Sequence, residues 1–324
     1  MRKVYFNKTV IELCTSIQEG LPLVATKYIR EIVEGVLAAA STKFRVTLCA
    51  FVVMRNHLHI LIVVHDPADV SAFMGYLKTE LAHAVNSLLG RKKRSVWEPD
   101  FDSPVVLTWE KVMERLEYVY LNPARANLSS SIRSYPGVSS FEYAEADTGK
   151  RTFTKRVKKI SRDAIPVLPK RVLSLRQQEV LASELRSGRG VEYELSVSPW
   201  AWLECFPETR EADPTVYQKR FLDKFFEAER KVVAEHKFPA PSPDELRMQD
   251  PRQRYESKRD GRKMLCMSTC VDLRCAFIDW YRTQAKRAKE ALKNFRQGDF
   301  TLKPPPGFFL PGGALLAAAL FPAL

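Results

Sequence analysis

Two histidines separated by one residue are the clearest candidates for chemistry in this sequence. His57 and His59 flank Leu58 within Met54–Ile62, and apolar residues follow them. In a β-strand alternate side chains share a face, so both imidazoles would point one way and Leu58 would point into a core. Neutral imidazole is a common ligand of divalent metals. The pair favours a metal site, and the competing interpretation is a strand end with two ordinary histidines.

A second candidate group lies downstream, in a helical pattern that we expect to end near Asn122-Pro123. Tyr118 and Asn122 are four residues apart and share a helical face. A carboxamide oxygen is an acceptable ligand for Mg²⁺ or Mn²⁺, so Asn122 is a candidate third ligand beside His57 and His59. Tyr118 would then stand one turn from the metal, where a phenol can attack a DNA phosphodiester. The alternative for Tyr118 is an aromatic core residue of an amphipathic helix.

The elements that must position these residues follow from the spacing of apolar residues. Apolar and β-branched runs predict four strands, at 9–17, 44–53, 57–64 and 105–107. Helical spacing predicts three helices, at 27–40, 68–89 and 108–122. The order matches a ferredoxin-like split βαβ palm, an antiparallel sheet with helices on one face. The last helix would cross the sheet near the histidine strand.

The rest of the chain differs in character. A length of 324 residues predicts two domains. We expect the palm in residues 1–145 and a basic linker in 146–172. Helical patterns predict a mostly α-helical C-terminal domain in 173–324, with a strongly basic helix near 271–295. The predicted fold class is therefore α+β, and the role of the C-terminal domain is open between DNA binding and assembly.

Positive charge predicts a polyanionic partner. The chain has 51 Lys and Arg against 38 Asp and Glu, a net charge of +13, which favours nucleic acid. For the run at 151–162 the alternative is a solvated charged segment. The residues expected to contact DNA phosphates are Arg91, Lys92, Lys93, Arg94, Arg125, Lys155, Arg156, Lys158 and Lys159.

Membrane and secretory classes are disfavoured. The N-terminus is basic but lacks the apolar core of a signal peptide. The apolar stretch 310–324 is too short to span a bilayer and is interrupted by proline and glycine. The six cysteines are expected to be reduced thiols, and the cluster Cys266, Cys270 and Cys275 lacks zinc-site spacing. We expect a cytoplasmic protein without a membrane partner.

The motifs resemble a known family. Asn56-His57-Leu58-His59-Ile60-Leu61, followed by the segment 118–128, is similar to the HUH single-tyrosine transposases with an IS200-like domain. Within these, the REP-associated tyrosine transposases are the most similar group. The segment 135–140 also resembles a short motif that follows in them, and Phe73-Met74-Gly75-Tyr76 and Trp97-Glu98 fit the intervening pattern. The resemblance covers about residues 5–145.

The resemblance implies a fold, a site and a reaction. The fold would be the ferredoxin-like palm. His57 and His59 match the paired ligands of a divalent metal, Mg²⁺ or Mn²⁺, Asn122 matches the third ligand, and Tyr118 matches the nucleophile. Family members cut single-stranded DNA beside imperfect palindromes that fold into hairpins. They form a 5′-phosphotyrosine, release a 3′-OH and rejoin strands without ATP, as monomers or homodimers.

Several alternatives stay open. Tyr120 is an alternative nucleophile, although it faces away from Asn122, and Tyr76 lies on another helix. Asn127 stands where relatives often have glycine, at a helix end or turn. A non-catalytic hairpin-binding regulatory protein on the same fold is a second functional class. Replication initiators and relaxases are a third, but these often have helicase or primase attachments that are absent here.

Overall fold

One mixed β-sheet organises the computed structural model, which describes residues 3–146, 151–255, 264–299 and 301–308. The strand order is β6-β7-β2-β3-β1-β4-β8, and β5 pairs with β2 beside this path. The fold class is therefore α+β. The strands are β1 (Thr9–Ser16), β2 (Val46–Val53), β3 (His57–Val64), β4 (Val105–Val106), β5 (Val138–Ser139), β6 (Phe153–Ile160), β7 (Gly190–Val197) and β8 (Cys266–Met267).

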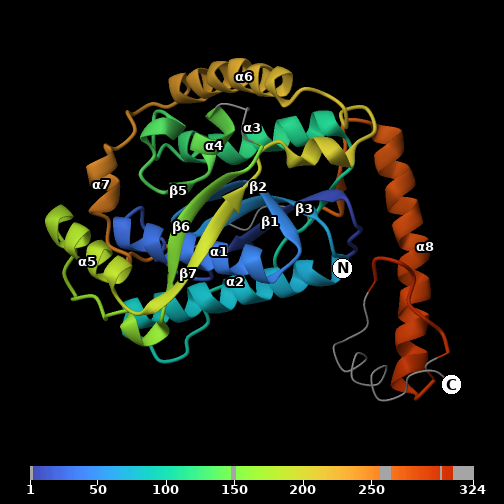
Figure 1. Cartoon of the computed structure of the whole chain (residues 1–324), viewed down its shortest axis with the longest axis horizontal. Helices are drawn as coiled ribbons and strands as arrows, with labels where there is room; N and C mark the ends of the chain where they lie inside the picture. Colours follow the sequence, from blue (N-terminus) through green and yellow to red (C-terminus); the bar gives the residue numbers. More distant parts are fainter. Residues whose placement is uncertain (1–2, 147–150, 256–263, 300, 309–324) are drawn as a thin grey trace.

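Helices cover both faces of this sheet (Figure 1). One face packs against α1 (Lys27–Lys43) and α2 (Pro67–Leu88), with α5 (Leu175–Ser187) against α1. The other packs against α3 (Trp109–Arg125) and α4 (Phe141–Glu145), and α6 (Pro214–Ala234) packs on these two helices. The remaining helices are α7 (Pro243–Arg247) and α8 (Val271–Arg296), and short 3₁₀ turns lie at Ile132–Ser134, Arg162–Ala164 and Ala201–Cys205.

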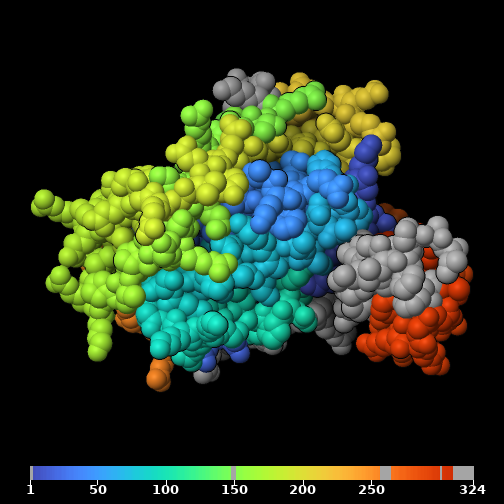
Figure 2. Space-filling model, turned by 60° about the horizontal axis from the view of Figure 1, so that its bottom comes forward, coloured from blue at the N-terminus to red at the C-terminus, as the bar shows by residue number. Residues whose placement is uncertain are grey.

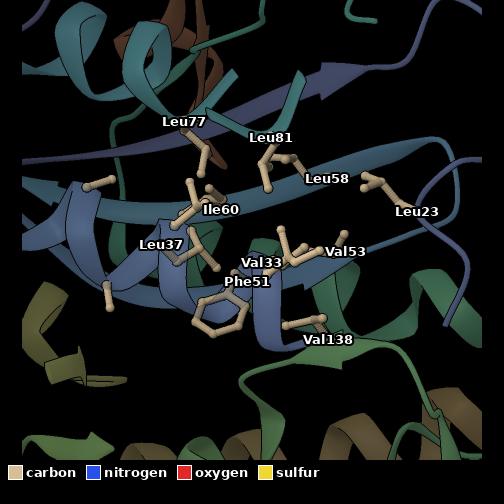
Figure 3. Close-up of a cluster of buried hydrophobic side chains, with 14 of the residues drawn as sticks. Leu23, Val33, Leu37, Phe51, Val53, Leu58, Ile60, Leu77, Leu81 and Val138 are labelled. Carbon is tan, nitrogen blue, oxygen red and sulfur yellow. The ribbon is translucent and has the colours of Figure 1, made fainter. Parts of the chain in front are cut away.

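Strand β3 shows the alternation that the sequence predicts. Leu58 and Ile60 are buried in the cluster formed with α1 and α2, and Figure 3 shows them close to Leu77 and Leu81 of α2. The odd-numbered residues lie on the opposite face, where Leu61 belongs to the second cluster, with α3 and α6. The histidines at the start of β3 therefore face the α3 side.

The first four strands lie in the order β2-β3-β1-β4, and every neighbouring pair is antiparallel. The sheet as a whole is mixed, because β7 joins β2 and β8 joins β4 in parallel. The expectation of helices on one face only was wrong. The apolar side of α3 contains Val112, Leu116 and Val119, all buried, and this side covers the face opposite α1 and α2.

Part of the expected linker at 146–172 is a strand instead. Residues 153–160 form β6, which pairs with β7 in an antiparallel register from Phe153↔Val197 to Ile160↔Gly190. Val157 and Ile160 are buried against the first core cluster, and this apolar contact fixes the strand among its charged residues. Residues 173–255 and 264–299 contain the helices α5 to α8, but they also supply β7 and β8 to the common sheet.

Helix α3 continues through Pro123 to Arg125, so the expected end at Asn122-Pro123 was wrong. Proline has no N–H to donate to the carbonyl four residues earlier, which here belongs to Val119. The side-chain Nδ2 of Asn122 donates to that carbonyl at 3.3 Å and to the Tyr118 carbonyl at 2.9 Å. The carboxamide thus supplies the hydrogen bond that Pro123 cannot make.

The turn after α3 explains the unusual asparagine. Asn127 has φ of 48°, in the left-handed region that favours glycine and tolerates asparagine. Its side chain donates a hydrogen bond to the Phe238 carbonyl at 3.2 Å.

Helix α8 projects from the main body, as Figures 1 and 2 show. It is anchored by a small apolar cluster that joins Val4, Tyr281 and Phe308 with small residues of α8. Within the described ranges, no helix is long and apolar enough to cross a membrane. The apolar stretch expected at 310–324 lies outside the described residues.

We predict that Asn127→Gly is more stable than Asn127→Ala by about 1 kcal/mol. A left-handed alanine costs roughly 1–2 kcal/mol in the folded protein. Part of this cost is offset because alanine has less conformational entropy than glycine in the unfolded chain. Both variants lose the bond to Phe238, so the comparison isolates the backbone. Urea unfolding of the two proteins measures the difference. An alanine variant at least as stable as the glycine variant would contradict the left-handed assignment.

Candidate active site

The histidine pair lies at the start of β3, with ring centroids 5.3 Å apart. The Nδ1 of His57 lies 2.9 Å from Oδ1 of Asn56, and the Nδ1 of His59 lies 2.9 Å from Oε1 of Glu12. Both acceptors are oxygens, so each Nδ1 donates a proton and each Nε2 is the nitrogen left for a ligand. This is the tautomer that metal-binding histidines use when an outer oxygen orients them.

Glu12 is a buried carboxylate in the middle of β1, with 2% of its surface exposed. Besides His59, it accepts hydrogen bonds from Nε of Arg115 at 2.5 Å and from Nη2 at 2.8 Å. Burial raises the pKa of Glu12, but the hydrogen bonds and positive charges of His59 and Arg115 outweigh burial and lower it. One anion therefore holds a β3 histidine and an α3 arginine together.

The two imidazoles have opposite electrostatic environments. Burial and the neighbouring His59 lower the pKa of His57 to about 4, although a side-chain hydrogen bond with Asn122 opposes this. Burial also lowers the pKa of His59, but Cys14 and Glu12 outweigh burial and raise it to about 10. Cys14 is the register partner of His59, with Sγ 3.8 Å from Nε2. A cation on His59, whether a proton or a metal, is therefore stabilised by the Glu12 carboxylate.

Tyr118 projects from α3 toward this pair. Its ring centroid is 5.5 Å from that of His59, and the side chain is half-buried. The guanidinium carbons of Arg115 and Arg125 lie 3.8 Å and 5.0 Å from the ring centroid, within cation–π distance. The phenol thus sits among two arginines and one histidine.

Asn122 lies one turn after Tyr118 and contacts His57. Its amide nitrogen donates to two helix carbonyls, so its oxygen is the atom available to a ligand. The structure therefore brings His57, His59, Tyr118 and Asn122 to one place on the α3 face, as the sequence predicts.

The alternative tyrosines have other positions. Tyr120 is fully buried, hydrogen-bonds Ser140 at 2.9 Å and packs against Phe141 at 5.2 Å. Burial raises its pKa far above the usual value for a tyrosine. Tyr76 packs near Phe44 with the α1 and α2 core, on the opposite face of the sheet. Neither tyrosine faces the histidine pair, so neither position favours a nucleophilic role.

The basic loop Arg91–Arg94 lies at the histidine end of the sheet. Ile17 bridges to Trp97 just after this loop, and its N–H donates to the Asn56 carbonyl at 2.6 Å. Lys92 and Lys93 are exposed, while Arg94 pairs with Glu19 at 2.7 Å. Arg125 places positive charge at the candidate site, and the loop Arg91–Arg94 lies at the same end of the sheet.

The basic residues of β6 are placed differently. Lys155 pairs with Glu34 at 2.6 Å and Lys159 pairs with Glu80 at 2.8 Å, and both acids are buried. Lys158 donates to the Gly188 carbonyl at 3.1 Å, while Arg156 is exposed. Three of the four cations thus stabilise the fold, and β7 and β2 separate their strand from the histidine strand. Their contact with DNA stays a prediction.

Two residues of the site were missed from the sequence. Glu12 is a charged residue inside the apolar run Val10–Leu13, which is a signal for a buried partner. Arg115 stands three residues before Tyr118, so the two share a helical face. Helical spacing predicts the contact of Arg115 with Tyr118, but the pairing of Glu12 with Arg115 depends on how α3 packs against β1.

The donor set fits a divalent ion. Two Nε2 atoms and one amide oxygen are ligands of the kind that Mg²⁺ or Mn²⁺ accepts beside water. The outer oxygens of Asn56 and Glu12 already orient both imidazoles. No group of three or more His, Cys, Asp and Glu side chains within the described ranges is arranged to hold a metal, so Asn122 is needed.

Residues 22–113 match the family model described as "Transposase IS200 like". This confirms the family that the motifs indicate, and the matched segment contains both histidines but ends before Tyr118. No curated protein matches the chain.

Two solved structures are similar to parts of the chain. One, a REP-associated tyrosine transposase bound to a REP hairpin, is 16% identical with a TM-score of 0.39, covering 44% of this chain and 83% of that one. The other, a putative transposase from Deinococcus radiodurans R1, is 17% identical with a TM-score of 0.24, covering 36% and 91%.

We predict that Glu12→Gln weakens Mn²⁺ binding by about 10–100-fold, because the neutral amide no longer orients His59 or balances the bound cation. Titration calorimetry with Mn²⁺ measures the affinity. The matched control is Glu34→Gln, another buried acid that pairs with Arg30 and Lys155 away from the site. Unchanged Mn²⁺ affinity in Glu12→Gln would show that the carboxylate does not support a metal ligand.

Proposed function

We propose that this protein is a metal-dependent transposase that cuts and rejoins single-stranded DNA at hairpin sequences through a 5′-phosphotyrosine. The observation that supports this most directly is the placement of Tyr118, 5.5 Å between ring centroids from His59. A nucleophile, two oriented imidazoles and a carboxamide oxygen share one site on an IS200-like domain.

The strand order supports the palm interpretation. The arrangement β2-β3-β1-β4, antiparallel throughout, is that of a split βαβ unit. The histidines lie at the start of β3, one of its two inner strands. Helix α3 crosses the face to which His59 points, so the tyrosine reaches the histidines from a second, rigid element.

In the proposed reaction the phenol oxygen of Tyr118 attacks a DNA phosphorus. The new bond joins tyrosine oxygen to phosphorus, and the bond from phosphorus to the 3′ oxygen breaks. The phenol proton is lost to solvent, and the departing 3′ oxygen gains one to become a 3′-OH. Attack by a 3′-OH on the phosphotyrosine reverses the step and joins strands without ATP. A divalent ion, when bound, withdraws charge from the phosphate.

The residues of this chain have distinct tasks in that reaction. His57, His59 and Asn122 would hold the ion, and Glu12 keeps the His59 ring in place. Arg115 positions the Tyr118 ring, and the Arg125 guanidinium lies over the same ring from two turns further along α3. Arg91–Arg94 and Arg125 would bind phosphates of the strand or the hairpin stem, which makes binding sensitive to salt.

We predict that Tyr118→Phe abolishes the covalent protein–DNA adduct, because the phenol oxygen is the proposed nucleophile. The assay incubates hairpin-bearing single strands with protein and Mn²⁺ and separates adducts on a denaturing gel. The matched control Tyr120→Phe keeps the adduct, since Tyr120 is buried against Ser140. An adduct that persists in Tyr118→Phe would reject the assignment. Salt-sensitive binding without any adduct would favour a non-catalytic hairpin-binding protein.

The ligand set has its own test. We predict that His57→Ala and Asn122→Ala each weaken Mn²⁺ binding at least tenfold, because each removes one of three protein donors. His65→Ala is the control, since His65 lies on the same face at the other end of β3 and is exposed. The free Mn²⁺ signal in electron paramagnetic resonance reports binding. An Asn122→Ala protein with normal affinity would remove Asn122 from the set.

A further inference from the structure

A second cavity lies on the α3 face, at the end of β3 farthest from the histidine pair. Its volume is about 630 Å³, within the range of sites for nucleotide-sized molecules. Thr47, Val63 and His65 line it from the N-terminal strands, and Trp200 and Arg210 line it from the C-terminal segment. Both parts of the chain are therefore needed to form it.

Positive charge dominates the cavity lining. Lys8, His65, Arg151 and Arg210 all line it and are exposed. Among the described residues, Lys8, Arg151 and Arg210 form no ion pair with an acid. Glu204 is the acidic side chain in the described lining. Such an excess of unpaired cations in a concave site attracts anions.

Polar donors accompany the cations. Trp200 lines the cavity and is 5% exposed, yet its indole Nε1 has no hydrogen-bond partner within the described residues. A buried indole N–H usually finds an acceptor, so its missing partner is an observation independent of the charges. Thr152 and Ser198 hydroxyls, 2.8 Å apart, add further hydrogen-bonding groups to the lining.

The charges converge on one region of the cavity. Lys8 comes from the turn before β1 and Arg210 from the loop before α6, yet both act on the thiol of Cys205. Burial, followed by Glu204, raises the pKa of Cys205 to about 12, while Lys8 and Arg210 oppose this. The two cations are thus near one another although they are far apart in the sequence.

We propose that this cavity binds a phosphate group, presented either by a free nucleotide or by a phosphodiester of single-stranded DNA. The planar guanidinium groups match phosphate oxygens, lysine adds a point charge, and the hydroxyl groups of Thr152 and Ser198 add hydrogen-bond donors. The site is distinct from the candidate active site, and phosphate binding there does not depend on cleavage by Tyr118.

The test measures binding to the full chain in EDTA, so that no divalent ion contributes. Thymidine 5′-monophosphate, thymidine and an unstructured thymidine octanucleotide are titrated by calorimetry. We expect the nucleotide or the octanucleotide to bind and thymidine not to bind. Arg151→Gln with Arg210→Gln should weaken the bound phosphate probe at least tenfold. The matched control, Arg171→Gln with Arg176→Gln, removes two exposed cations near α5 and should leave binding unchanged.

A second variant, Ala212→Phe, fills the cavity without removing charge and should weaken binding equally. If the double arginine variant fails to fold, Ala212→Phe still tests whether the phosphate probe binds in this cavity. If the variants lose binding of the monophosphate, the cavity takes the phosphate of a free nucleotide. If they lose only binding of the octanucleotide, the cavity takes a phosphodiester of single-stranded DNA. Equal binding of thymidine and its monophosphate, or unchanged binding in both cavity variants, would overturn the proposal.

Discussion

The candidate site depends on one buried carboxylate. Glu12 is almost fully enclosed in the sheet, where an unpaired charge would cost several kcal/mol, and it is tolerated because His59 and Arg115 both donate to it. These two donors belong to β3 and α3, the elements that contribute the histidines and the tyrosine. One charged contact therefore links the two halves of the site, and the Arg115 guanidinium that makes it also lies against the ring of Tyr118.

Much of the site follows from the sequence because it depends on local periodicity. Alternation along β3 places His57 and His59 on one face, and helical spacing places Tyr118 beside Asn122. What periodicity does not contain is the register between distant strands. Cys14 and Glu12 reach His59 only because β1 runs antiparallel to β3 with Cys14 opposite His59. The outer residues of the site are thus less predictable than the inner ones.

The fold was predictable from local periodicity but not from contacts between distant segments. The four strands of the first half, in their order along the chain, follow from apolar runs. The strand β6 was missed because only Val157 and Ile160 are buried among its lysines and arginines, so its charge pattern is typical of a solvated segment. The charges themselves are explained by two buried acids, Glu34 and Glu80, on helices far away in the sequence. A composition of this kind cannot distinguish ion pairs inside a fold from a surface that binds DNA.

The late strands have a consequence for how the protein is made. β7 and β8 occupy the outer sides of β2 and β4 and come from residues 190–197 and 266–267. During synthesis the chain emerges from its N-terminus, so the edge of β4 and the part of the β2 edge that β5 does not cover stay open until these later residues have left the ribosome. Exposed edge strands promote wrong pairing between chains. A fragment cut after the early strands would keep those edges, and a nascent chain depends on its C-terminal segment to close them.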